Sequence, residues 1–172
     1  MELGGARILV TNDDGINAPG LKVLERLARR LSDDVWVVAP ESEQSASGHS
    51  LTLTLPLRIR KVSKRRFAVN GTPTDSVLLG VQKIIVAAAM EGTLLGIPSI
   101  ALSQVRVYGE NVRWAATEGH GEAVVRRLVK AGWARNILLN VNFPDVAADL
   151  VGDVEVTVQG RRKIGDAITT GT

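Results

Sequence analysis

The sequence has no cysteine, only two histidines among its 172 residues, and an aromatic content of 3%. The lack of cysteine excludes a disulfide scaffold and a thiolate metal site, and two histidines are too few for a polyhistidine metal cage. No apolar run reaches the roughly 18 residues that a membrane span needs, and residues 1–6 lack the pattern of a signal peptide. We therefore expect a cytoplasmic protein with no membrane partner.

An excess of charge of either sign is also missing, because 21 Lys and Arg residues face 18 Asp and Glu residues. This near balance argues against a dedicated polyanion binder, and we expect no stable nucleic-acid partner. The basic run Arg58–Arg66 contains no aromatic side chain on which bases would stack. We interpret it as a solvent-exposed edge strand that its charges protect from aggregation.

Two short apolar runs, Arg7–Thr11 and Asp34–Ala39, are typical of buried parallel strands. Between them, Pro19–Leu31 has apolar residues every three or four positions, which predicts an amphipathic helix that begins at a proline. A strand, a helix and a second strand in this order imply a parallel sheet with a right-handed crossover. The sequence contains no dinucleotide-binding, P-loop or G-x-S-x-G motif.

The same patterns predict further elements along the chain. They are an edge strand within Leu51–Val62, a helix capped by Thr72 with Pro73 in its first turn, a strand at Ile97–Leu102, a helix at Asn111–Ala131 and a strand at Asn136–Asn142. After Pro144 the signal weakens to a strand-like alternation of Val154, Val156 and Val158. At Lys83–Ile85 two helical patterns follow each other directly, whereas a doubly wound sheet needs a strand there.

Two adjacent carboxylates, Asp13 and Asp14, follow the first predicted strand, where open α/β sheets place their ligands. Adjacent acids repel each other unless a cation lies between them, and the composition leaves an oxygen-preferring ion such as Mg²⁺ or Mn²⁺. The alternative is that both residues serve only the turn and the start of the next helix. Composition alone does not decide between these interpretations.

The loop Pro40–Ser50 follows the second predicted strand and therefore opens at the same edge of the sheet. Its serines, among them Ser45, together with Gly48 suit an anion or a phosphate bound to a metal. A solvated loop is the alternative. His49 is either a general acid or a partner of the loop backbone.

Two other functions are compatible with adjacent acids on such a sheet. A receiver module of a signalling system also binds Mg²⁺ there, but it needs an acceptor Asp after a later strand, and Ile97–Leu102 is followed by Ser103 and Gln104. A non-catalytic protein that binds nucleotides through Ser45–Ser50 is the second alternative.

Four segments together closely resemble the SurE family of stationary-phase survival proteins. They are Val10–Gly20 (VTNDDGINAPG), Val38–Thr52 (VAPESEQSASGHSLT), Asn70–Asp75 (NGTPTD) and Val86–Gly92 (VAAAMEG). The resemblance runs in order from about Arg7 to Pro144 and continues more faintly over Val154–Lys163.

This resemblance implies a Rossmann-like α/β fold: a doubly wound, mostly parallel sheet with helices on both faces, in residues 1–145. It implies that residues 146–172 begin a β-rich C-terminal extension for oligomerisation, so that we expect a homodimer or homotetramer. Members of the family are phosphatases that hydrolyse nucleoside 5′- or 3′-monophosphates with one divalent metal ion, Mg²⁺ or Mn²⁺, per subunit. The implied site residues are Asn12 and Asp13 for catalysis, Asp13, Asp14 and Ser45 for the metal, and Asn12, Ser45, Gly48 and His49 for the phosphate.

The sequence departs from the family pattern in two places. At Lys83–Ile85 it lacks a strand, a Ser-Gly-x-Asn-x-Gly loop whose Asn is the fourth metal ligand in the family, and a Ser-Gly-Thr motif. At Thr172 it stops before most of the extension. We expect disorder of these segments, rather than deletion, to explain both departures.

Overall fold

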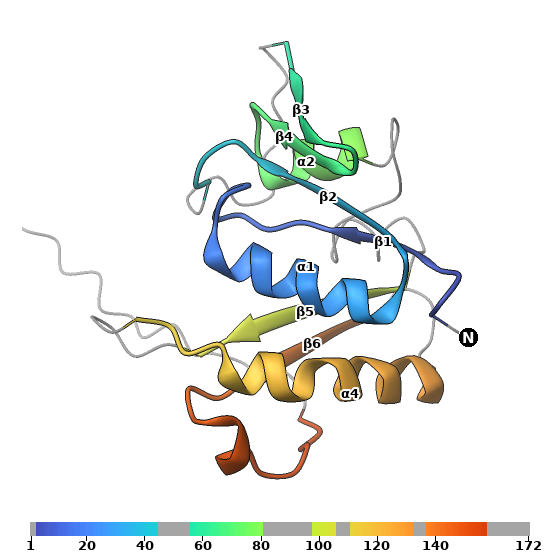
Figure 1. Cartoon of the computed structure of the whole chain (residues 1–172), viewed down its shortest axis with the longest axis vertical. Coiled ribbons are helices and arrows are strands. Elements are labelled where there is room, and N and C mark those ends of the chain that lie inside the picture. The colour runs from blue at the N-terminus through green and yellow to red at the C-terminus, as the bar shows by residue number, and fades with distance from the viewer. Residues whose placement is uncertain (1–2, 45–55, 81–97, 106–110, 133–136, 158–172) are drawn as a thin grey trace, which may run out of the picture.

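The computed structural model describes residues 3–44, 56–80, 98–105, 111–132 and 137–157. The elements in chain order are β1 (Arg7–Val10), α1 (Pro19–Leu31), β2 (Asp34–Pro40), β3 (Ile59–Ser63), β4 (Arg66–Val69), α2 (Pro73–Leu79), β5 (Ser99–Gln104), α4 (Ala115–Ala131), β6 (Leu138–Phe143) and a 3₁₀ turn (Ala148–Leu150) (Figure 1). No helix within these ranges is long and apolar enough to cross a membrane.

The strands form two groups. Four of them make a sheet in the order β1-β2-β4-β3, in which β1, β2 and β4 are parallel and β3 is antiparallel to β4. A parallel pair, β5 and β6, makes the second group. Within the described ranges, β1 pairs with β2 alone and β5 with β6 alone. The prediction of a mostly parallel sheet is confirmed.

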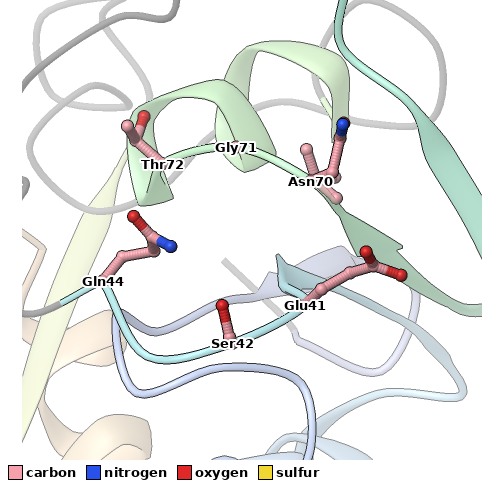
Figure 2. Close-up of a pocket in the computed structure, with 7 residues that line it drawn as sticks. Glu41, Ser42, Gln44, Asn70, Gly71 and Thr72 are labelled. Carbon is pink, nitrogen blue, oxygen red and sulfur yellow. The ribbon is translucent and has the colours of Figure 1, made fainter.

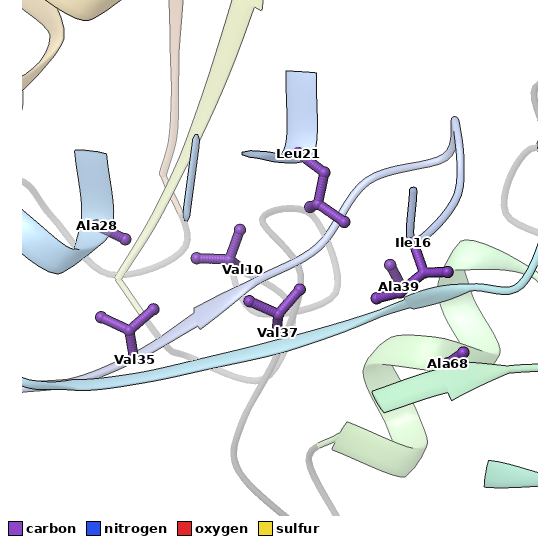
Figure 3. Close-up of a cluster of buried hydrophobic side chains, with 8 residues drawn as sticks. All are labelled: Val10, Ile16, Leu21, Ala28, Val35, Val37, Ala39 and Ala68. Carbon is purple, nitrogen blue, oxygen red and sulfur yellow. The ribbon is translucent and has the colours of Figure 1, made fainter. Parts of the chain in front are cut away.

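Helices cover both faces of the four-stranded sheet, as a doubly wound fold requires. On one face, Leu21 and Ala28 of α1 pack on the branched side chains of β1 and β2, including Val10 and Val37 (Figure 3). On the other face, Gly80 at the end of α2 lies against Val38. Each buried strand therefore has apolar residues on both sides.

The second group of strands shares a helix with the first. Leu27 of α1 and Val125 of α4 form a buried cluster, and Ile8 of β1 and Ile100 of β5 pack against it. The two helices cross at Gly121, where an added Cβ would collide with a side-chain methyl group of Leu27. Helix α1 thus packs against both β1 and β5, which connects the two groups of strands although β1 and β5 do not pair with each other in the described ranges.

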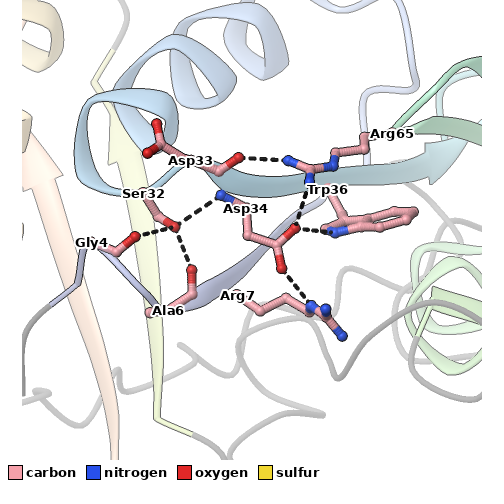
Figure 4. A network of polar contacts seen from close by, with 8 residues as sticks. All are labelled: Gly4, Ala6, Arg7, Ser32, Asp33, Asp34, Trp36 and Arg65. Atoms are coloured by element: carbon pink, nitrogen blue, oxygen red, sulfur yellow. Dashed lines mark hydrogen bonds and ion pairs between the residues drawn. The ribbon is translucent and has the colours of Figure 1, made fainter.

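A polar network ties the amino ends of β1 and β2 together (Figure 4). The Asp34 carboxylate accepts hydrogen bonds from Arg7 Nε at 2.7 Å and from Trp36 Nε1 at 2.8 Å. Arg65 lies 3.3 Å from the same carboxylate and stacks over the Trp36 ring. Ser32 donates to the carbonyl group of Ala6 and accepts from the Asp34 amide at 3.1 Å. This network lies at the amino ends of the strands, whereas the acidic loop lies at their carboxyl ends.

Several sequence expectations change. Strand β4 was not predicted, and the helix expected from Asn111 begins at Ala115. The strand-like alternation that includes Val154 and Val156 forms no strand within residues 151–157 of the single chain, and the Val156 side chain is 96% exposed. The junction at Lys83–Ile85 lies outside the described residues.

Candidate functional site

A tight acidic loop follows β1. Asp13 and Asp14 are exposed, and the Asn12 side-chain nitrogen donates to the carbonyl oxygen of Gly15 at 3.2 Å. Gly15 has a φ of +98°, a conformation that residues with a Cβ rarely adopt. A Cβ there would also lie 3.0 Å from the carbonyl carbon of Ser42. Glycine is therefore required for the loop to turn this closely against its neighbour.

Main-chain hydrogen bonds fix the acidic loop to the loop that follows β2. The Ile16 amide donates to Pro40 O at 2.7 Å, and the Gln44 amide donates to Asp13 O at 2.8 Å. Arg66, at the start of β4, donates to Ile16 O and pairs with Glu25 of α1. The backbone of the acidic loop is thus held by contacts with the loop after β2 and with Arg66 of β4 as well as by its own strand.

Two buried polar atoms beside the carboxylates have no hydrogen-bond partner in the described part of the chain, namely Thr11 Oγ1 and Asn12 Oδ1. Buried polar groups are normally satisfied, so such atoms indicate a place for a ligand or water. The atoms at the end of β1 that could ligate a metal are hydroxyl, amide and carboxylate oxygens. Oxygens are the ligands that Mg²⁺ and Mn²⁺ prefer. The residues present therefore fit a hard divalent cation.

The described residues supply only part of a ligand set. No three His, Cys, Asp or Glu side chains gather anywhere in the described ranges. Further ligands would have to come from hydroxyl or amide oxygens, from substrate or from water.

A pocket of about 340 Å³ opens beside the acidic loop (Figure 2). Its walls are the loops that follow the neighbouring strands β2 and β4, and it is lined by Glu41, Ser42, Gln44, Val69, Asn70, Gly71 and Thr72. Figure 2 shows the Ser42 hydroxyl and the Gln44 side chain directed into the opening below Gly71. Because Gln44 is bonded to Asp13 through its backbone, the pocket adjoins the carboxylates.

Thr72, which lines this pocket, is the N-cap of helix α2, and the helix is capped by its own side chains. The Asp75 amide donates to Thr72 Oγ1 at 3.1 Å, and the Thr72 amide donates to Asp75 Oδ2 at 2.8 Å. Asp75 is 1% exposed. The prediction of Thr72 as the N-cap is confirmed, and its reciprocal bonds keep this wall in a fixed position.

The structure brings three of the predicted site residues together, Asn12, Asp13 and Asp14. The other three, Ser45, Gly48 and His49, lie outside the described residues. Sequence reasoning missed the pocket residues after β4 because that strand was not predicted, so residues 70–72 were not expected at the ligand edge of the sheet. The adjacency of the Asn-Gly-Thr-Pro segment to a short apolar run was the signal that could have found them.

The basic run makes ion pairs within its own domain. Arg60 lies 2.7 Å from Glu41, and Arg65 and Arg66 pair with Asp34 and Glu25. All five residues of β3 are exposed. These contacts agree with the interpretation of a charged edge strand.

Comparisons with known proteins agree with one another. Residues 8–86 and 85–166 match a family model described as Survival protein SurE. A protein of Paramagnetospirillum magneticum named 5′-nucleotidase SurE is 57% identical, over 94% of this chain and 73% of its own length. A protein of the same name from Parvibaculum lavamentivorans is 50% identical, over 91% and 67%. The crystal structure of the SurE protein from Aquifex aeolicus superposes with a TM-score of 0.80 at 33% identity, covering 90% of this chain and 72% of that one.

The comparisons also locate an internal difference. The alignment with the Paramagnetospirillum protein has 189 positions, more than the 172 residues of this chain, so that relative has residues without a counterpart here. The two matched segments meet at residues 85–86. The break in the family pattern predicted at Lys83–Ile85 is confirmed. The explanation by disorder is wrong at this position, because the sequence is continuous through Ile84 and Ile85.

Proposed function

Because the chain belongs to the SurE family, we propose that it is a metal-dependent phosphomonoesterase that releases phosphate from nucleoside 5′- or 3′-monophosphates. The observation that carries the proposal is the acidic loop at residues 12–15, fixed by main-chain bonds at the edge where such sheets bind ligands. The name 5′-nucleotidase of the curated relatives supports the same chemistry. Family membership also favours this activity over a receiver module.

In this proposal Asp13, Asp14 and the Ser45 hydroxyl hold one Mg²⁺ or Mn²⁺ ion. When bound, such an ion would supply Lewis-acid chemistry to the phosphate ester and would make water a stronger nucleophile at neutral pH. Asn12 has its side-chain nitrogen engaged with Gly15, so its buried oxygen is left to accept a hydrogen bond from the attacking water. Gly48 and His49 lie in the loop assigned to the phosphate.

The test is phosphate release from AMP and 3′-AMP with Mg²⁺ or Mn²⁺, before and after EDTA. We expect EDTA and Asp13→Asn each to abolish turnover. This loss is larger than the roughly 10–100-fold loss of activity that follows mutation of residues which only support the metal ligands. The melting temperature of Asp13→Asn should not fall, because the substitution removes repulsion between neighbouring carboxylates. Asp33→Asn, an exposed aspartate at the opposite edge of the sheet, is the matched control.

Three results would contradict the proposal. Turnover that persists in EDTA would exclude the metal-dependent mechanism. Binding of AMP without any turnover would instead support the non-catalytic alternative. A melting temperature of Asp13→Asn that falls together with activity would show that the carboxylates are structural.

We further propose that the chain assembles as a homodimer or homotetramer through an extension that begins within residues 146–172. The support is a set of exposed apolar side chains near the end of the described chain, where Leu150 is 70% exposed and Val154 is 54% exposed. Apolar side chains left this exposed are typical of a surface that another molecule covers.

A further inference from the structure

We propose that the pocket between the loops after β2 and β4 is a nucleoside subsite, in which Ser42 and Gln44 hydrogen-bond to the base or ribose. This inference rests on the proposed function, since it assigns the part of the substrate that the acidic loop does not bind. Nothing in the comparisons assigns a role to this pocket.

Position is the first argument. The strand order β1-β2-β4 places the pocket one strand away from the acidic loop, on the same edge of the sheet. Gln44 belongs to both places, because its amide bonds to Asp13 O at 2.8 Å while its side chain faces the pocket (Figure 2). The cavity is therefore near enough to the acidic loop to receive the alcohol group of a phosphate monoester bound at Asp13 and Asp14.

Size is the second argument. Ligand pockets usually measure about 300–1,000 Å³, and a volume of about 340 Å³ is at the lower end of that range. It suits one nucleoside. Glycine is needed at position 71 of the wall, because a Cβ there would lie 2.7 Å from Asp75 Oδ2 and 2.8 Å from a methyl carbon of Leu57.

Charge is the third argument. Among the described residues no Lys or Arg lines the pocket, and the only carboxylate there, that of Glu41, is paired with Arg60 at 2.7 Å. The amides of Thr72 and Asp75 are bonded within the capping box of α2, and Pro73 has no N–H, so these three positions offer no donor to an anion. The lining therefore disfavours further phosphate groups and favours an uncharged ligand that both donates and accepts hydrogen bonds, as bases and ribose do.

Ser42 is the most informative residue to substitute in a test of this proposal. Its hydroxyl has no hydrogen-bond partner within the described part of the chain, and its side chain is exposed to the pocket. Ser42→Leu fills the cavity without removing an internal bond, and Ser42→Ala removes only the hydroxyl. Ser63→Leu is the matched control, because Ser63 is an exposed serine of β3 that pairs with Arg66 at the far end of β4.

The experiment titrates adenosine into the purified chain by calorimetry and measures inhibition of AMP hydrolysis by inorganic phosphate. For Ser42→Leu we expect the adenosine Kd and the KM for AMP to rise by about tenfold or more, which is a loss of about 1.4 kcal/mol of binding. The inhibition constant of phosphate should change less than about twofold. Ser42→Ala should show a smaller rise in the same constants, and Ser63→Leu should show none.

The proposal is overturned if wild-type protein does not bind adenosine, if Ser42→Leu binds it as well as wild type, or if the substitution weakens phosphate and adenosine equally. Melting curves of both Ser42 variants identify any loss of folding, and Ser42→Ala keeps the test valid if the leucine variant unfolds. Adenosine binding without AMP hydrolysis would support the subsite while contradicting the proposed function.

Discussion

Asp34 is a carboxylate whose contacts serve the fold, unlike those of Asp13. Hydrogen bonds from Arg7 and then from Trp36 hold its pKa below the ordinary value of 3.8, and the positive charge of Arg65 acts in the same direction. A carboxylate with a lowered folded-state pKa stabilises the protein above its unfolded-state pKa, and this contribution is lost as the pH falls through the folded-state pKa. The contribution is therefore present at neutral pH.

We predict that Asp34→Asn lowers the melting temperature at pH 7, and that the difference from wild type shrinks as the pH falls below about 4. The physical reason is that wild-type Asp34 becomes protonated there and resembles the neutral variant. Thermal unfolding between pH 2.5 and 7 measures this, with Asp33→Asn as the control. A difference that stays constant over this range would show that Asp34 acts through shape and not through charge.

Individual residues were predicted with unequal success. Asp13 and Asp14 follow the first strand directly, so sequence position alone placed them at the ligand edge. Thr72 was identified because a helix cap depends on neighbours within three residues. The pocket role of Ser42 depends on a loop from another strand, and no local pattern reports such a contact.

Among the elements, β4 shows where sequence patterns fail. Arg66–Val69 has only four residues and follows a run of positive charges, so it lacks the length that marks a strand. Its extended conformation comes from pairing with β2 on one side and β3 on the other. Strand formation of this kind is set by neighbours in the sheet more than by intrinsic preference.

The missing internal segment is also a matter of elements. Helix α1 covers β1 and β5 together, yet in the described ranges neither strand pairs with the other. The match to the family model divides at residues 85–86, where the sequence patterns also lack an expected strand, and the alignment with the Paramagnetospirillum protein is longer than this chain. A strand placed between β1 and β5 would join the two groups into one sheet.

We predict that inserting the extra residues of the Paramagnetospirillum relative between Ile85 and Val86 raises the melting temperature. Each apolar side chain that becomes buried contributes about 1.5–3 kcal/mol, and each kcal/mol raises the melting temperature of a chain of this size by about 2–4 °C. A glycine–serine insertion of equal length is the control and should give no rise. Equal melting temperatures for both insertions would contradict a strand at this position.

At the scale of the whole molecule, the first strand, helix and strand were sufficient to predict a parallel sheet, because their order permits few topologies. The family resemblance then predicted the Rossmann-like fold, which the likeness to the Aquifex structure confirms. The only sequence feature that indicated two groups of strands was the absence of a strand pattern at Lys83–Ile85. Assembly of several copies leaves no periodic signal in a single chain and stays a prediction.

We predict that the purified chain elutes with a mass of two or four times 18.4 kDa. Replacing both Val154 and Val156 with Asp should shift it toward the monomer, because charged side chains oppose burial of this exposed apolar segment. Light scattering coupled to size exclusion measures the mass, and Val62→Asp on the exposed strand β3 is the control. A wild-type monomer at micromolar concentration would refute the assembly.

The backbone and the side chain of Gln44 have different contacts: the backbone amide bonds to Asp13, and the side chain faces the pocket. The amide that holds Asp13 is present in any residue other than proline, whereas the group that faces the pocket changes with every substitution. Substitutions at this position would therefore change the side chain that faces the proposed nucleoside subsite while the backbone of the acidic loop stays in place. Under the proposed function, substitutions at residue 44 would change which substrate is bound while the acidic loop keeps its position, so directed evolution of substrate preference would start at this residue.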